Sequence, residues 1–288
     1  MKIYKTPIGL VAHQEDAYRL LPGIGLTALL TSSDAMALAK QAWDQGNAVA
    51  APTTLLAPVD GQEIWAAGVT YYRSRVARME ESKAAGGGSF YDRVYDAPRP
   101  ELFFKSTASR VAAPGAAMKL RKDSKWMVPE PELALLINNV GKIIGYTVGN
   151  DLSARDLEGE NPLYLPQAKT WDTSASVGPC WLLTERPLAG ETEVRLQILR
   201  EGVVVNEDST TLAQMKRTAE ELVSYLFEEL SFPLGCLMMT GTGIVPPDNF
   251  TLQPGDVVRI SIPPIGTLQN VMIGKLSSLH VSSLVQPT

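Results

Sequence analysis

The 288-residue sequence predicts an α+β protein that is mostly β-sheet. From residue 101 onward, short apolar segments are separated by turn residues, which is typical of strands. Few segments have the apolar spacing of a helix, so the chain lacks the strand–helix alternation of a doubly wound parallel sheet. The first 60 residues are mixed in character. We therefore expect a small N-terminal domain over residues 1–60 and a main domain over residues 61–288.

The N-terminal segment contains one well-marked helix, over residues 32–46. Ser33 or Asp34 is its candidate N-cap, good helix formers follow, and Gly46 is expected to end it. Residues 61–72 then predict a strand that leads into an irregular segment.

The polar segment 73–99 includes three consecutive glycines within AAGGGS, residues 84–89. Beside a charged helical stretch, these glycines predict a helical flap with a hinge. A phosphate-binding loop is the alternative, but such loops continue into Lys-Ser or Lys-Thr, and this one does not.

The rest of the chain predicts successive strands, in ELFFKSTASRV, PELALLINN, GKIIGYTVGND, GPCWLL, PGDVVRISIP and GTLQNVMIGK. A hairpin is expected over residues 194–210, with its turn at Glu201-Gly202. An amphipathic helix is expected over residues 212–230. Its apolar face would consist of Leu212, Met215, Ala219, Leu222, Leu226 and Leu230.

The composition limits the classes of function. A net charge of −5 argues against nucleic acid as a partner, because phosphate binding requires a basic surface. No apolar run would span a bilayer and no signal peptide is recognised, so we expect a cytoplasmic protein. Cys180 and Cys236 lie in apolar segments and are expected to be buried free thiols. With only His13 and His280 available, we expect neither a Ser-His-Asp triad nor a His-rich zinc site.

Two carboxylates lie on one face of a predicted strand, in VPEPELALLIN, residues 128–138. Residues i and i+2 of a strand point the same way, so Glu130 and Glu132 repel each other and are costly to bury together. A turn at residues 138–142 and a second strand bring Asp151 back toward both. Three converging carboxylates form the all-oxygen site that suits Mg²⁺ or Mn²⁺. The alternative is a solvent-facing pair on an edge strand, and spacing alone does not decide between the two.

Longer motifs resemble the fumarylacetoacetate hydrolase superfamily in content, order and spacing. They are LFFKSTASRV (102–111), VPEPELALLINNVGKIIGYTVGNDLSARD (128–156), AKTWDTSASVGPC (168–180) and TGTGIVPP (240–247). The resemblance covers about residues 60–280 and implies a β-sandwich roll with a small N-terminal domain. It also implies metal ligation by Glu130, Glu132 and Asp151. Members of this family act on 2-oxo acids, which chelate the metal through a carboxylate and a keto oxygen.

The same resemblance implies further site residues. Lys169 stands at the family's active-site lysine, and its ammonium would stabilise an enolate oxygen. Thr173 and Ser174 would hydrogen-bond substrate oxygens. Lys105 and Ser106 would line the cavity or, alternatively, have structural roles.

One motif departs from the hydrolytic members, which carry Gly-Leu-Asn-Tyr-x-x-His and use a His–Glu pair to activate water. Here the stretch reads GVTYYRS, residues 68–74, with Ser74 at the histidine position. The pKa of a serine is too high for the same base chemistry, so Ser74 is kept as a substrate-binding candidate. Glu80 and Glu81 follow on the predicted flap, where no histidine can pair with them.

The chain instead resembles the 2-keto-3-deoxy sugar acid dehydratases of this family, in the stretch 150–179. They also carry a glutamate just before the FFK strand, here Glu101, which is the implied acid/base group. The alternative interpretation is that Glu101 is only a charged residue at the start of a strand. The implied reaction is Mg²⁺-dependent dehydration of a 2-keto-3-deoxy pentonate to 2,5-dioxopentanoate. In it, Glu101 removes a C3 proton, Lys169 holds the enolate, and the C4 hydroxyl leaves.

Two other hypotheses are kept. The metal site also fits hydrolysis or decarboxylation of an acylpyruvate-like 2-oxo acid, and Ser74 weakens that hypothesis. A metal-binding protein without catalysis is the third, weakened by the presence of Glu101 and Lys169. The resemblance further implies a homodimer or homotetramer. No motif for a nucleotide, flavin or pyridoxal cofactor is found.

Overall fold

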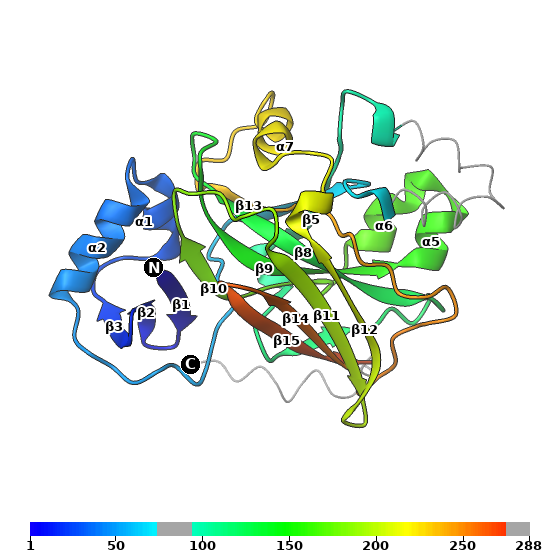
Figure 1. Ribbon diagram of the computed structural model, residues 1–288, viewed down its shortest axis with the longest axis horizontal. Coiled ribbons are helices and arrows are strands. Elements are labelled where there is room, and N and C mark those ends of the chain that lie inside the picture. The colour runs from blue at the N-terminus through cyan, green and yellow to red at the C-terminus, as the bar shows by residue number, and fades with distance from the viewer. Residues whose placement is uncertain (74–93, 275–288) are drawn as a thin grey trace.

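The computed structural model describes residues 1–73 and 94–274, whose strands form two sheets (Figure 1). The larger sheet consists of β1 (Lys2–Thr6), β2 (Gly9–Gln14), β3 (Ala17–Leu21), β4 (Glu63–Gly68), β5 (Glu101–Thr107), β6 (Val111–Ala112), β8 (Met127–Ile137), β9 (Ile143–Ala154), β10 (Ala175–Leu183) and β13 (Cys236–Met239). The smaller consists of β7 (Ala117–Lys119), β11 (Glu193–Arg200), β12 (Val203–Thr211), β14 (Val257–Ile262) and β15 (Gly266–Ile273). The helices are α1 (Leu26–Thr31), α2 (Ala35–Gln45), α5 (Arg155–Glu160), α6 (Leu165–Lys169) and α7 (Ala219–Leu226). This mostly β architecture confirms the predicted fold class.

The strand order of the larger sheet is β3-β2-β1-β10-β9-β8-β13-β4-β5, with β6 beside β10, and that of the smaller is β12-β11-β14-β15-β7. Strand β8 lies inside the larger sheet, and all eleven of its residues are buried. Leu133 and Leu135 pack into one core cluster with strands of the smaller sheet, whereas Ala134 and Leu136 pack into a second cluster with the N-terminal helices. Because alternate residues of a strand point to opposite faces, β8 is covered on both sides.

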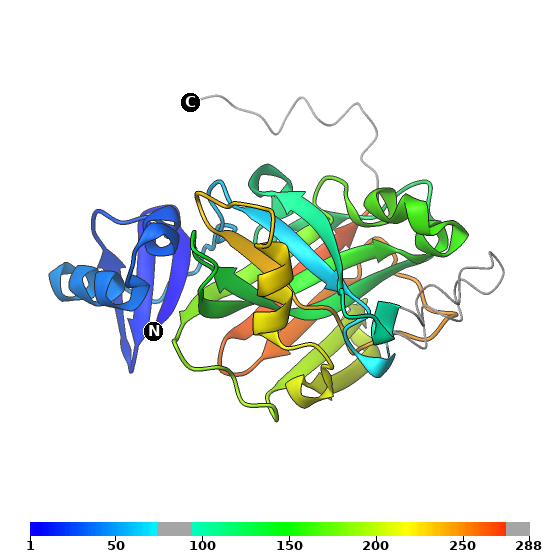
Figure 2. The same ribbon diagram turned by 90° about the horizontal axis from the view of Figure 1, so that it is seen from above.

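The N-terminal segment extends the larger sheet, because β1 pairs antiparallel with β10. Its helices pack against the sheet through residues that include Leu29 and Ala39. Helix α2 begins at Asp34, whose carboxylate accepts a hydrogen bond from the backbone of Ala37, and ends at Gly46, as predicted. Figure 2 shows these first residues at one end of the molecule. The division at residue 60 stays a prediction.

The hairpin predicted over residues 194–210 is confirmed as β11 and β12. Its turn residues, Glu201 and Gly202, have φ values of 52° and 81°, as a tight hairpin turn of this hand requires. The buried free thiols are also confirmed at Cys180 and Cys236.

The single helix predicted over residues 212–230 is wrong. Only Ala219–Leu226 is α-helical, and Leu230 is 43% exposed. Met215 instead forms a β-bridge with Tyr71, which requires extended backbone before the helix. The Thr218 side chain then accepts a hydrogen bond from the backbone of Glu221 and caps a helix that starts later than its apolar spacing predicts.

Several predictions fall outside the described residues. They concern residues 74–93 of the flap predicted over 73–99, with Ser74, Glu80 and Glu81, and also His280. Within the described ranges, none of the helices has the length and apolar character needed to cross a membrane.

Candidate active site

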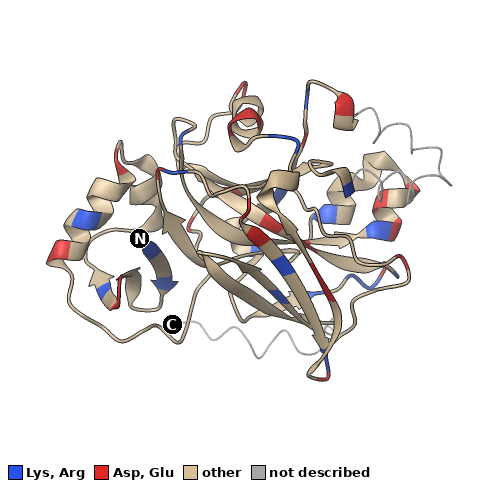
Figure 3. Ribbon diagram, viewed as in Figure 1, with Lys and Arg blue, Asp and Glu red and all other residues tan. Residues whose placement is uncertain are grey.

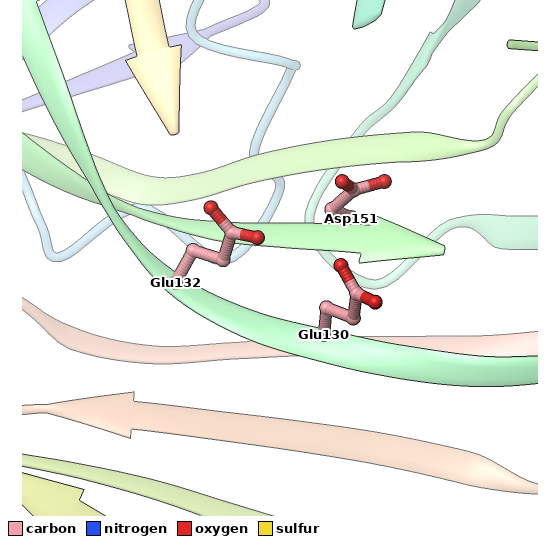
Figure 4. Close-up of side chains that lie close together, drawn as sticks. All are labelled: Glu130, Glu132 and Asp151. Atoms are coloured by element: carbon pink, nitrogen blue, oxygen red, sulfur yellow. The ribbon is translucent and has the colours of Figure 1, made fainter. Parts of the chain in front are cut away.

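Three carboxylates converge on the hairpin formed by β8 and β9. Glu130 pairs directly with Asp151 across the two strands, and Glu132 follows two residues along the same face of β8. Their side chains point toward one another (Figure 4), and one oxygen of each lies within 4.8 Å of the others. Their exposed fractions are only 3%, 1% and 0% for Glu130, Glu132 and Asp151. The alternative of a solvent-facing pair is therefore wrong.

Three cations hold part of this negative charge: Lys169, Arg155 and Lys105, whose ammonium lies 2.5 Å from Asp151 Oδ1. Lys169, the last residue of α6, donates to Glu130 Oε2 at 2.6 Å and to Asp151 Oδ2 at 3.2 Å. The same ammonium donates to Ser153 Oγ at 2.6 Å. Arg155, at the start of α5, donates to Glu130 Oε1 at 2.9 Å. Figure 3 shows acidic and basic residues side by side at this end of the molecule, on α5 and α6.

Glu132 lies in a different environment. Among the described residues it has no ion pair, and its Oε2 accepts a hydrogen bond from the backbone N–H of Gly241. Burial, and then the charges of Asp151 and Glu130, raise the pKa of Glu132 well above its ordinary value. A further cation in the cluster would therefore favour the charged form of this carboxylate.

The backbone donor at Gly241 depends on glycine. Its φ is +91°, and a Cβ there would lie only 2.0 Å from Thr70 Oγ1. Thr70 Oγ1 in turn donates to the carbonyl of Thr240 at 2.7 Å, so the loop after β13 is fixed against the loop after β4. The next residue, Tyr71, is also buried, and burial followed by the charge of Glu132 raises its pKa.

These residues fit a divalent cation. Asp151 Oδ1 is buried and lies 2.5 Å from the ammonium of Lys105. The three buried carboxylates nevertheless place one oxygen each within 4.8 Å of the others, and Glu132 has no ion pair among the described residues. Hard cations such as Mg²⁺ prefer carboxylate oxygens of this kind. The geometry predicted from the sequence for Glu130, Glu132 and Asp151 is thus observed.

The proposed base, Glu101, begins β5 and pairs across the sheet with Gly68 of β4. A Cβ at Gly68 would lie 2.5 Å from Glu101 Cδ, so the bare glycine makes room for this carboxylate. A catalytic role for Glu101 stays a prediction.

The remaining candidates have partners within the protein. Thr173 Oγ1 accepts from the backbone N–H of Lys119, and Ser174 Oγ accepts from that of Trp171. Ser106 Oγ donates to the carbonyl of Thr107. Lys105 is fully buried beside Asp151. Substrate binding by Thr173, Ser174, Ser106 and Lys105 is not tested by these contacts.

Sequence reasoning missed three residues that contact the site: Ser153, Arg155 and Gly241. Ser153 continues the alternation that places Asp151 on the inner face of β9, so the same two-residue spacing could have found it. Arg155 follows at the start of α5, which strand alternation does not describe. Gly241 contributes a backbone N–H, which no side-chain pattern reveals.

Comparison with known proteins gives the family. The family model for fumarylacetoacetate (FAA) hydrolase, C-terminal, matches residues 63–273. The chain belongs to the fumarylacetoacetate hydrolase family. This confirms the resemblance that the sequence motifs indicated.

Within this family, two relatives are similar over most of the chain. One is a probable 2-keto-3-deoxyxylonate dehydratase of Haloferax volcanii, 50% identical over 215 residues, which are 74% of this chain and 73% of the relative. Another is the 2-dehydro-3-deoxy-D-arabinonate dehydratase of Saccharolobus solfataricus, 43% identical over 214 residues, which are 73% and 72% of the two chains. A solved 2-keto-3-deoxy-D-arabinonate dehydratase complexed with magnesium and 2,5-dioxopentanoate matches with a TM-score of 0.82 at 32% identity, covering 96% of this chain and 100% of that chain.

Proposed function

We propose that this member of the fumarylacetoacetate hydrolase family is a Mg²⁺-dependent hydro-lyase. It converts a 2-keto-3-deoxy pentonate to 2,5-dioxopentanoate and water. The observation that carries the proposal is the buried cluster of Glu130, Glu132 and Asp151 with Lys169 beside it. This cluster occurs in a chain that is 50% identical to a probable dehydratase of such an acid.

The substrate names of the two relatives are chemically close. Xylonate and arabinonate of the D series differ at C2 and C3 and share the configuration at C4. A 2-keto-3-deoxy acid has a ketone at C2 and two hydrogens on C3, so C4 is its remaining stereocentre. In the D series both names therefore describe one compound, which we propose as the substrate.

The residues of the site account for the reaction. Mg²⁺ bound by Glu130, Glu132 and Asp151 would act as a Lewis acid that makes the C3 hydrogens of the 2-oxo acid more acidic. Glu101 takes a C3 proton, and the fixed positive charge of Lys169 favours the enolate that results. Burial of the cluster excludes water, so these charges act at low dielectric and have larger effects than in solution.

Elimination then proceeds with atoms balanced. The C4 hydroxyl leaves with a proton as water, which gives a C3–C4 double bond. Loss of one C5 proton and the hydroxyl proton, with protonation of C3 and C4, converts C5 to an aldehyde. The net change is loss of one water. Substrate contacts from Ser106, Thr173, Ser174 and Ser74 belong to this proposal as sequence-based predictions.

The assembly and location of the protein are also proposals. We expect a homodimer or homotetramer, which light scattering would test against the 31.2 kDa mass of one chain. A measured mass of one chain at working concentration would contradict this. Two buried free thiols fit a reducing compartment, so we propose a cytoplasmic location.

The test of the reaction is a product analysis. Purified protein is incubated with Mg²⁺ and 2-keto-3-deoxy-D-pentonate, and the products are identified by NMR. We expect formation of 2,5-dioxopentanoate. EDTA should stop this formation, and excess Mg²⁺ should restore it. Acylpyruvates and oxaloacetate are the control substrates. Pyruvate or CO₂ release from these, with no dehydration of the pentonate, would support the hydrolase or decarboxylase alternative, and no turnover of any substrate would support metal binding without catalysis.

A further inference from the structure

Lys105 is a fully buried lysine whose contacts lie entirely inside the protein. It belongs to β5, at the edge of the larger sheet. Its ammonium donates to the carbonyl of Leu152 at 3.0 Å and to the carbonyl of Lys169. It also lies 2.5 Å from Asp151 Oδ1, as an ion pair. The ring of Trp171 covers it, with the ring centroid 5.2 Å from Nζ.

These contacts account for the hydrogen-bonding capacity of the ammonium. A lysine has three N–H donors and no acceptor. Two of the donors of Lys105 are taken by backbone carbonyls, and its remaining close contact is a carboxylate. A substrate could bind Lys105 directly only by displacing one of these contacts in a buried site.

The partners of Lys105 are the parts of the chain that form the active site. Leu152 follows the proposed metal ligand Asp151 on β9, and Lys169 ends α6. In the larger sheet β5 is separated from β9 by β4, β13 and β8. Lys105 therefore joins the edge of the sheet to a strand far from it in the pairing order. This contact fixes Asp151 and Lys169 relative to each other.

We infer that Lys105 is a positioning residue, which holds Asp151 and Lys169 in the geometry that metal binding and proton transfer require. The kinetic part of this inference rests on the proposed function, whereas the metal-binding part does not. Residues that support metal ligands from outside the coordination shell typically change metal affinity by roughly 10- to 100-fold when they are replaced.

The direction of the change separates positioning from a simple charge effect. Removing a positive charge beside a cation site, with nothing else altered, strengthens cation binding by Coulomb's law. Loss of positioning weakens it, because Asp151 is no longer held toward the other ligands. A direct role in substrate binding would leave Mg²⁺ affinity unchanged and raise KM.

The experiment compares Lys105→Met with Lys142→Met. Methionine has nearly the length of lysine without its charge. Lys142 is an exposed lysine in the turn of the β8–β9 hairpin, at the opposite end from Asp151, and it pairs with Glu185. Calorimetry with Mg²⁺ alone gives the affinity, and circular dichroism checks the fold. We expect Lys105→Met to bind Mg²⁺ roughly 10- to 100-fold more weakly and to lose kcat, with Lys142→Met unchanged.

A second variant covers the case in which Lys105→Met does not fold. Lys105→Arg keeps the charge but presents a planar fork, which does not reproduce the three contacts. We expect it to weaken Mg²⁺ binding and lower kcat, though less than methionine does. If a variant that folds correctly binds Mg²⁺ as well as the wild type or more strongly, the inference is overturned. If wild-type protein fails to dehydrate the pentonate, the proposed function is wrong, and the Mg²⁺ titrations still decide the positioning role.

Discussion

Replacing Gly68 by alanine tests where the proposed base must lie. A Cβ at this position would be 2.5 Å from Glu101 Cδ and Oε2, and 2.7 Å from Oε1. Ordinary contact begins at 3.4 Å, so the carboxylate would have to move by about 0.9 Å. Gly68 has no positive φ, so alanine strains nothing in the backbone, and the flexible Glu101 side chain is the part that moves. Because a misplacement of about 1 Å at a reacting group can cost roughly 10²-fold in rate, we expect kcat to fall by that factor.

The assay follows exchange of the C3 hydrogens of the substrate in D₂O by NMR, together with turnover. Exchange reports the first proton removal alone. Glu101→Gln shows the activity that remains without the proposed base, with an expected loss of roughly 10²–10⁴-fold in kcat. Gly190→Ala is the matched control, because its Cβ would meet Ala213 at an ordinary 3.4 Å. Wild-type exchange and turnover in Gly68→Ala would refute the placement of Glu101 as the base, and full exchange in Glu101→Gln would refute its role.

Three further outcomes are expected. Glu132→Gln should keep the fold but weaken Mg²⁺ binding by roughly tenfold or more, because one anionic ligand becomes neutral; unchanged affinity by calorimetry would contradict the assigned ligand set. Burial raises the pKa of the Cys180 thiol to about 11 and that of Cys236 further, so the reactive thiolates form only as pH rises far above neutral. Native protein should therefore react slowly with a thiol reagent at pH 8 and rapidly once denatured, and rapid reaction of the native form would show that these sites open. Finally, Glu201→Asn should stabilise the β11–β12 turn by up to roughly 1 kcal/mol, because asparagine tolerates the φ of 52° better than glutamate does; a lower melting temperature would count against this.

The metal cluster could be predicted because its geometry is local. Glu130 and Glu132 are two residues apart, and one hairpin brings Asp151 opposite them. Period-two alternation and a single short turn therefore determine the convergence of three side chains. The same rule extends to Ser153, which sequence reasoning did not use.

Other features depend on contacts between distant segments and were not predictable in the same way. The contact of Lys105 with Leu152 requires the edge of the sheet to approach a central strand. The late start of α7 depends on a bridge between Met215 and Tyr71, which are far apart in the sequence. No local propensity contains these contacts, and the family resemblance supplied the role of Lys169 without its geometry.

The position of β8 has a consequence for how this scaffold can change its chemistry. The strand that carries Glu130 and Glu132 is covered on both faces, so its side chains tolerate little alteration. Glu101 lies instead on β5, the edge strand of the larger sheet, and is only half-buried, so fewer neighbours constrain its replacement. On the proposed mechanism, mutations at this edge can therefore exchange one proton-transfer group for another while the cation site is inherited intact. A dehydratase and a hydrolase could then share an ancestor through a few substitutions near this edge of the sheet.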